Sequence, residues 1–278
     1  MKLFSLLFFT VVCLGIIIAG NIHYDNKVAS SVQPETESDQ GQTEQDLTDN
    51  VESVSAGEGE GVTAGEESAL RYSPAEAASE PFATMMEEAL GDGRDLRIVV
   101  AGSNAVLAEE EADKGWPQIV EEQLREMYST SQIEIEVVSF DQKSTFEVIE
   151  SDGDEKLAEL APDVLLFEPL ILNDNARVSI DDTLFNINRI LQTVKSSNDE
   201  VAAYIVPTNP IHQAGYYLTQ IEKLEDFAEE EEWPYIDHWE NWPDVENDDI
   251  LTYLQESVPS QDGHDAWAEA VVSELTGR

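Results

Sequence analysis

Ser103 is the residue of this sequence best placed for chemistry, because it follows an apolar, β-branched run that ends at Gly102. The run from Leu96 to Ala101 predicts a buried strand of a parallel sheet. In α/β proteins, the small residues after such a strand form a turn that displays a nucleophile or binds an anion. The same residues also suit a simple turn that caps the next helix. Ser103 alone therefore predicts either role.

Two further groups that could transfer a proton follow predicted strands. Glu168 ends the run that starts at Asp163, where burial would raise the pKa of its carboxyl toward that of a general base. A carboxylate there is equally suited to cap nearby backbone N–H groups. His238 follows Asp237 at the end of the run from Pro234 and is the best candidate base for Ser103. Neighbouring residues of a strand point to opposite faces, so Asp237 orients His238 only if the strand has already ended.

Other side chains are candidates for the wall of a pocket. Asn209 and His212 follow the predicted strand from Val201 to Pro207, and Trp239 follows His238. A tryptophan in such a loop stacks on a sugar ring or packs in the core. We expect these three residues to face the same crevice as Ser103, together with Glu168.

The elements that must position these residues alternate along the chain. Strands are predicted over Leu96–Ala101, Ile133–Phe140, Asp163–Glu168, Val201–Pro207 and Pro234–Asp237. Helical stretches are predicted over Gly115–Tyr128, Ser144–Leu160 with a break near Gly153, Ile180–Ser197, His212–Glu230, Asp249–Gln255 and Gly263–Leu275. This pattern predicts an α/β three-layer sandwich with a five-stranded parallel sheet in the flavodoxin-like order 2-1-3-4-5. Its crevice lies between strands one and three.

The N-terminal third has a different character. Residues 1–21 are mostly apolar behind a single Lys2 and predict a membrane anchor, or alternatively a cleaved signal peptide, with the rest of the chain outside the cytoplasm. Residues 22–93 are rich in Ser, Thr, Glu, Gln, Asp and Gly and predict a disordered acidic linker. Within it, apolar residues of Ala75 to Leu90 recur at helical spacing. They predict a short helix that packs against the domain or forms only transiently. Residues 94–278 form the predicted domain.

The chain is strongly acidic, with 59 acidic and 14 basic residues and a net charge of −45. Such a surface repels phosphate backbones, so we expect no nucleic-acid partner. Adaptation of an exported protein to a salty or alkaline medium explains the charge better than calcium capture, because Asp152-Gly153-Asp154-Glu155 lacks the spacing of a calcium loop. The one cysteine lies in the anchor, which excludes disulfides and thiolate metal sites from the domain. We expect a monomer without a cofactor.

From Asp95 to the C-terminus the sequence resembles the SGNH/GDSL hydrolases, in a divergent, Bacillus-type branch. The resemblance rests on the order and spacing of short motifs: Gly102-Ser103, Gly115-Trp116-Pro117, Pro162–Pro169 with Leu172–Asn175, Pro207–Ile211 with Tyr216-Tyr217, Tyr235–Trp239, and Gly263-His264. It implies that Ser103 is the nucleophile and that Asn173 or Asn175 donates to the oxyanion, together with the Ser103 N–H.

The sequence departs from the family at two places. No glycine follows the second strand, where Asp141, Gln142 and Lys143 stand. The Asp-x-x-His pair that activates the serine is also degenerate, because Gln255 and Val258 precede Pro259. The resemblance places His264 at a helix start, where it caps or packs.

Three functions follow as hypotheses. The first is an extracytoplasmic serine esterase or deacylase that acts on a small-molecule or carbohydrate ester, such as acylated cell-wall carbohydrate, with Ser103 and a relocated base. The second is a catalytically degenerate module that binds a glycan or another envelope component. The third is a structural envelope spacer. A histidine within reach of Ser103 would distinguish the first from the others.

Overall fold

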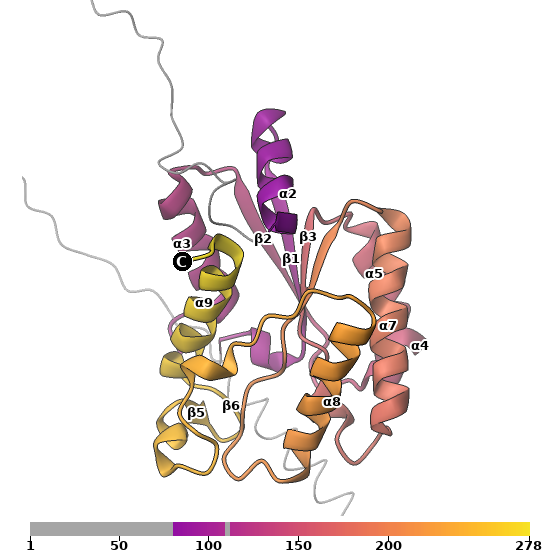
Figure 1. Cartoon of the computed structure of the whole chain (residues 1–278), viewed down its shortest axis with the longest axis vertical. Coiled ribbons are helices and arrows are strands. Elements are labelled where there is room, and N and C mark those ends of the chain that lie inside the picture. The colour runs from indigo at the N-terminus through magenta and orange to yellow at the C-terminus, as the bar shows by residue number, and fades with distance from the viewer. Residues whose placement is uncertain (1–79, 109–111) are drawn as a thin grey trace, which may run out of the picture. The chain divides into compact units, whose positions relative to one another are not determined.

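The computed structural model describes residues 80–108 and 112–278. Its central layer is a parallel sheet of four strands in the order β2-β1-β3-β4, shown in Figure 1. The strands are β1 (Leu96–Gly102), β2 (Ile133–Ser139), β3 (Val164–Phe167) and β4 (Ala202–Ile205). The predicted α/β class and parallel sheet are therefore confirmed.

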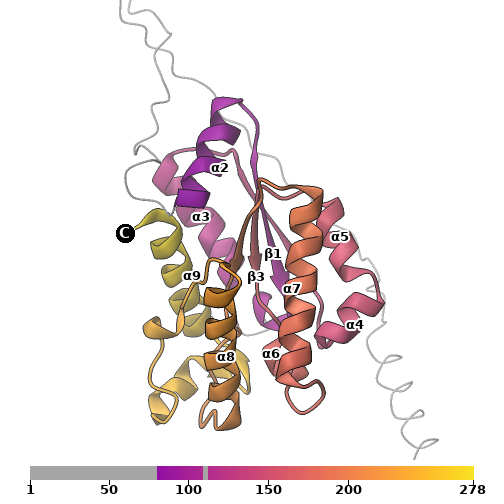
Figure 2. The ribbon, with the colours of Figure 1, turned by 45° about the vertical axis from the view of Figure 1, so that its right-hand side comes forward.

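Helices cover both faces of the sheet, as Figures 1 and 2 show. One face carries α2 (Glu80–Gly91), α3 (Trp116–Tyr128) and α9 (Gln261–Thr276). The other carries α4 (Thr145–Glu150), α5 (Gly153–Glu159), α7 (Ile180–Ser197) and α8 (Tyr216–Glu230). The sheet separates two hydrophobic cores, and successive residues of β1 belong to them in turn. Ile98 and Val100 pack on the α3 side, and Val99 and Ala101 pack on the α7 side. This alternation explains why β1 is apolar from Ile98 to Ala101.

The prediction of a fifth strand at Pro234–Asp237 is wrong. The segment passes beside β4 but forms only a single parallel bridge between Ile205 and Tyr235. Two hydrogen bonds hold it there, from the Ile205 N–H to the Pro234 carbonyl (2.8 Å) and from the Ile236 N–H to the Ile205 carbonyl (2.9 Å). Pro234 has no N–H, and the chain turns at His238 into the short helix η3 (Trp239–Asn241), so the ladder cannot lengthen.

Helix α2 lies in the segment predicted as linker. Phe82, Met85, Met86 and Ala89 recur at helical spacing, and all four are buried in the same core as β1. Of the two alternatives for the helix predicted at Ala75 to Leu90, the described part therefore fits the one that packs against the domain. The predicted anchor (1–21) and most of the predicted linker lie outside the described residues.

Short elements crowd the carboxyl edge of the sheet. They are η2 (Asn104–Val106), α6 (Ile171–Asp174), η4 (Asp248–Thr252) and the two-residue strands β5 (Leu254–Gln255) and β6 (Val258–Pro259), which pair antiparallel. The predicted helix over Asp249–Gln255 is thus a 3-10 turn that runs into a hairpin. Among the helices the structure describes, none is long and apolar enough to cross a membrane.

Candidate active site

Ser103 stands directly after β1, where the sequence places it, but its side chain serves the backbone. Its Oγ accepts a hydrogen bond from the Ala105 N–H (3.2 Å), which caps η2. Only 3% of the residue is exposed. Ser103 therefore combines the position of a nucleophile with the bonding of a helix cap.

The Glu168 carboxylate lies directly beneath this turn. It follows β3, is fully buried, and accepts three hydrogen bonds. The donors are the Ser103 N–H at 2.5 Å, the Leu170 N–H at 2.9 Å and the Thr208 hydroxyl. The carboxylate therefore joins the loops after β1, β3 and β4, which is the capping role anticipated for it.

Gly102 is needed for this arrangement. A Cβ at residue 102 would lie 2.6 Å from the Glu168 Cβ and 2.7 Å from its Oε2. Real Cβ atoms do not approach so closely, so any larger residue would push the carboxylate off the Ser103 N–H. The Gly-Ser pair is therefore explained by the packing of Glu168.

This contact opposes ester hydrolysis. In a serine esterase the N–H of the nucleophile stabilises the negative oxygen of the tetrahedral intermediate. Here that N–H is bonded to a resident carboxylate. A second negative charge beside Glu168 would meet repulsion in a buried setting, where charges interact strongly.

His238, the predicted base, is buried and fully bonded. Its Nε2 lies 2.7 Å from the Pro207 carbonyl, to which it donates, and its Nδ1 accepts from the Trp242 indole (3.0 Å). The ring also stacks on Trp267 at 4.2 Å. Burial lowers the pKa of His238 to about 3. With both nitrogens engaged, the ring has no lone pair left for the Ser103 hydroxyl, and the structure gives it a packing role.

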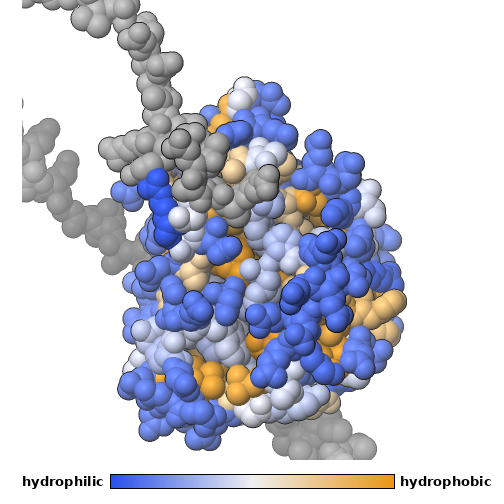
Figure 3. Space-filling view, viewed as in Figure 1, coloured by the Kyte–Doolittle hydropathy of each residue, from blue (hydrophilic) through white to orange (hydrophobic). Residues whose placement is uncertain are grey.

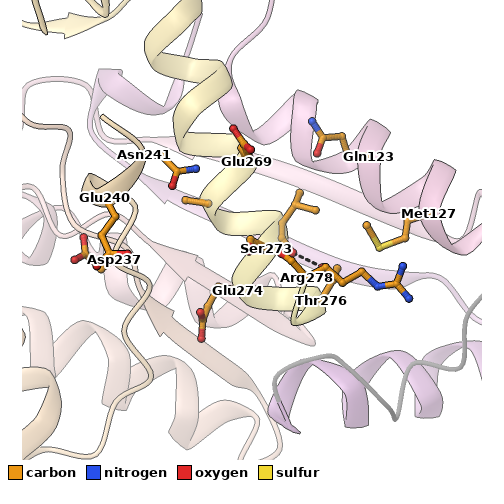
Figure 4. Close-up of a pocket in the computed structure, with 12 residues that line it drawn as sticks. Gln123, Met127, Asp237, Glu240, Asn241, Glu269, Ser273, Glu274, Thr276 and Arg278 are labelled. Carbon is orange, nitrogen blue, oxygen red and sulfur yellow. Dashed lines mark hydrogen bonds between the residues drawn. The ribbon is translucent and has the colours of Figure 1, made fainter. Parts of the chain in front are cut away.

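Asp237 and His264 do not supply the missing base either. Asp237 is exposed and accepts from the Trp239 N–H through its Oδ1 (2.9 Å). It lines a separate hollow of about 370 Å³ between α3, α9 and η3, shown in Figure 4. His264 is buried, and its Nδ1 accepts from the Trp116 N–H (3.3 Å). Burial lowers the pKa of His264 to about 4, which agrees with the packing role that the resemblance implies.

The two candidate oxyanion asparagines are part of the loop scaffold. The Asn173 amide donates to the carbonyls of Asp141 (3.0 Å) and Lys143 (2.9 Å), in the loop after β2. Asn175 ends α6, and its N–H donates to the Ile171 carbonyl (3.0 Å). The Asn173 amide protons are therefore used to join two loops, as the Ser103 N–H is.

Three predicted pocket residues meet around the loop after β4. The Trp239 indole donates to the Thr208 carbonyl (2.9 Å). The buried Asn209 amide donates to the carbonyls of Pro210 (3.0 Å) and Ser257 (3.1 Å). The Nε2 of His212 lies 3.4 Å from Asp248. The side-chain N–H groups of Trp239 and Asn209 are thus used to hold neighbouring loops together, and a common crevice with Ser103 stays a prediction.

Thr208 and Tyr217 belong to this cluster but were not predicted as site residues. Thr208 donates to Glu168, and the Tyr217 hydroxyl donates to the Thr208 carbonyl (3.0 Å) and the Asn209 carbonyl (3.1 Å). Burial raises the pKa of Tyr217 well above its ordinary value, and the charge of Glu168 adds to the shift. The only sequence signal was their presence in the Pro207–Ile211 and Tyr216-Tyr217 motifs.

Gln255 and Val258, at the positions of the activating pair, face each other across the β5–β6 hairpin. Gln255 also lines a small hollow with Ser260 and Gln261. Neither side chain can accept a proton from Ser103. Within residues 80–108 and 112–278, no cluster of three or more His, Cys, Asp or Glu side chains could hold a metal ion.

Comparison with known proteins supports the fold. No family model matches the sequence, and no curated protein matches it. Solved structures do match. A protein of the G-D-S-L lipolytic family from Desulfitobacterium hafniense has a TM-score of 0.51 and 16% identity, over 65% of this chain and 100% of that one.

Two further structures agree with it. A lipase/acylhydrolase from Enterococcus faecalis has a TM-score of 0.50 and 17% identity, over 66% of this chain and 96% of that one. A family 3 carbohydrate esterase from Talaromyces cellulolyticus has a TM-score of 0.52 and 10% identity, over 65% and 96%. Identities this low establish architecture and leave activity to the site residues. The described part of this chain therefore has the fold of the SGNH/GDSL hydrolases.

Proposed function

We propose that this protein is a non-hydrolytic SGNH-fold module that binds a glycan or another envelope component outside the cytoplasm. The observation that carries its non-hydrolytic part is the 2.5 Å contact between the Ser103 N–H and the buried Glu168 carboxylate. It places a negative charge where a hydrolase must stabilise one.

The proton-transfer groups support the same conclusion. Gln255 and Val258 stand where the resemblance expects an aspartate and a histidine. The two buried histidines near the site have pKa values of about 3 and 4, whereas a general base at neutral pH works best with a pKa near 7. Without a base, the serine hydroxyl is a weak nucleophile.

The proposed location rests on the N-terminal sequence. The apolar residues from Leu3 to Ala19 suit an anchor or a signal, and the acidic stretch behind them suits a tether that holds the domain away from the membrane. The high negative charge suits a solvated exported protein.

A serine esterase is the second candidate, and one observation favours it: Ser103 occupies the end of β1, where the hydrolases of this fold carry their nucleophile. To act, Ser103 would need a rearrangement that frees its N–H from Glu168 and brings a base to its hydroxyl.

The test is to treat the purified full-length chain and its Ser103→Ala variant with a fluorophosphonate probe and with acetylated xylo-oligosaccharides and aryl acetates. We expect no labelling of the wild type, and acetate release equal to that of Ser103→Ala. Labelling of the wild type that disappears in Ser103→Ala would overturn the proposal and establish the esterase.

A further inference from the structure

A groove in the helical layer that contains α4 and α7 combines exposed aromatic rings with fixed polar groups. It lies between the start of α4, the loop before α7 and the first turns of α7, and has a volume of about 720 Å³. This size suits a ligand rather than a solvent molecule. Figure 2 shows α4 and α7 side by side. Ser103, Glu168 and His238 do not line this groove.

Two phenylalanines flank the groove, Phe146 from α4 and Phe185 from α7. Their exposed fractions are 53% and 69%. Five large hydrophobic side chains are exposed in the described part of the chain, and two of them meet here. Figure 3 shows a mostly hydrophilic surface, with pale orange residues at the edge where α4 and α7 lie in Figure 1. Two exposed rings in one groove cost solvation free energy that a ligand would recover.

The polar groups of the groove are held in place by their own bonds. The Glu147 carboxylate accepts from the Ser144 N–H (2.8 Å) and from Arg177 (2.8 Å). These partners lower the pKa of Glu147, the bond from the Ser144 backbone being the main cause. The Asp182 carboxylate accepts from the Ser179 hydroxyl (2.6 Å). Groups fixed in this way lose little entropy when they bind a ligand.

A buried network supports this arrangement from below. The fully buried Asp174 carboxylate accepts from the Thr145 N–H (2.8 Å), the Thr145 hydroxyl (2.6 Å) and the Thr183 hydroxyl (2.6 Å). Asn186, which lines the groove, donates to the Thr145 hydroxyl (3.0 Å). The network ties α6, α4 and α7 together, so the spacing of the two phenylalanines is fixed by a rigid base.

The charges select the class of ligand. Three carboxylates, Glu147, Glu150 and Asp182, face one guanidinium, Arg177. This balance disfavours phosphates, uronates and other anions. The mixture of carboxylates, guanidinium and amide suits hydroxyl groups. A hydroxyl donates to a carboxylate and accepts from the N–H groups of Arg or Asn. The C–H faces of sugar rings pack on aromatic rings as other apolar surfaces do.

We propose that this groove binds a neutral pyranose glycan, with its sugar rings packed on Phe146 and Phe185. The inference rests on the proposed binding function and assigns it a site. The hydroxyls of the glycan bond to the Glu147 and Asp182 carboxylates and to Arg177. The ligand is held by ring packing and hydrogen bonds, and no covalent step is involved.

The experiment is a calorimetric titration of the full-length chain with three neutral oligosaccharides: xylohexaose, cellohexaose and N-acetylchitohexaose. Phe146→Ala and Phe185→Ala should each weaken the binding of the preferred oligosaccharide by about tenfold. Tyr216→Ala is the matched control, because Tyr216 is 63% exposed on α8 and lies outside the groove. We expect it to bind like the wild type. Unfolding curves of all variants exclude loss of folding as the cause.

The proposal is overturned if none of the three oligosaccharides binds saturably, or if Tyr216→Ala weakens binding as much as the phenylalanine variants do. Binding of oligolysine that needs Phe146 and Phe185 would assign the groove to a cationic partner instead. Self-association that needs them would assign it to a second copy. Each result is independent of labelling at Ser103, so failure of this inference and failure of the non-hydrolytic proposal are distinguishable.

Discussion

The turn around Ser103 and the groove between α4 and α7 differ in how much side-chain surface they expose. Around Ser103, the Glu168 carboxylate, the Ser103 N–H and the Thr208 hydroxyl are buried and bonded to one another. In the groove, the polar groups are also bonded to one another, but Phe146 and Phe185 are 53% and 69% exposed. The first region has the position of an active site, and the second has surface left for a ligand.

The difference teaches that the position of a side chain in a fold does not fix its chemistry. At the end of β1, the Ser103 N–H is bonded to the Glu168 carboxylate, which links two loops. The proposed binding function needs an open surface on rigid elements, and the groove between α4 and α7 offers one.

The largest expected effect is from Glu168→Ala. It would leave the Ser103 N–H, the Leu170 N–H and the Thr208 hydroxyl buried without a partner, which costs about 1–3 kcal/mol for each group. We therefore expect the free energy of unfolding to fall by about 3 kcal/mol or more, measured by denaturant titration. Glu222→Ala, an exposed change on α8, is the control. A loss as small as that of the control would show that Glu168 is not the structural centre of this turn.

Acid should destabilise the domain through its buried histidines. The pKa values of His238 and His264 in the folded state, about 3 and about 4, lie below the ordinary value of 6.5. As the pH falls below 6.5, the unfolded chain takes up protons that the folded chain does not, so stability falls. Between about pH 7.5 and pH 5.5 we expect a loss of about 2–3 kcal/mol from the two groups together.

Tryptophan fluorescence during urea unfolding at several pH values measures this loss, since Trp267 stacks on His238. His264→Gln removes one of the two groups and should reduce the loss by about half. Stability that stays level or rises as the pH falls would mean that the rings are charged in the folded state, and with it that His238 is open to proton transfer.

Ser103→Ala distinguishes a cap from a nucleophile by whether it lowers or raises the stability of the folded domain. Removing the hydroxyl leaves the Ala105 N–H without its acceptor, and loss of such a cap costs about 1 kcal/mol. Replacement of a catalytic residue often stabilises a protein instead, because catalytic sites trade stability for activity. The thermal unfolding midpoint should therefore fall. A rise would favour the esterase.

The smallest effect on stability is expected in the groove. Phe185→Ala removes a side chain that is 69% exposed, so the free energy of unfolding should change by no more than about 0.5 kcal/mol. Thermal unfolding measures it. A larger loss would show that the ring packs against the domain and is not a free contact surface, which would remove the contrast with Ser103.

The sequence by itself determined the layers of this protein. The apolar runs within Leu96–Ala101 and Asp163–Glu168 predicted buried strands, and the apolar spacing of Ile180–Ser197 predicted a helix that covers a sheet. These are local consequences of side-chain periodicity, which is why they were predictable. The break near Gly153 was predictable for the same reason, and the structure places it between α4 and α5.

The tertiary structure decided the site. Whether Glu168 acts as a base or a cap depends on the Ser103 N–H and the Thr208 hydroxyl, which come from two other loops that are far from Glu168 in sequence. The same holds for His238, whose partners Pro207 and Trp242 lie on different segments. The prediction of a fifth strand failed because the pairing of a segment into a sheet depends on the neighbouring strand as well as on the composition of the segment. Hydrogen-bond partners are chosen by three-dimensional proximity, so no local pattern could have revealed them.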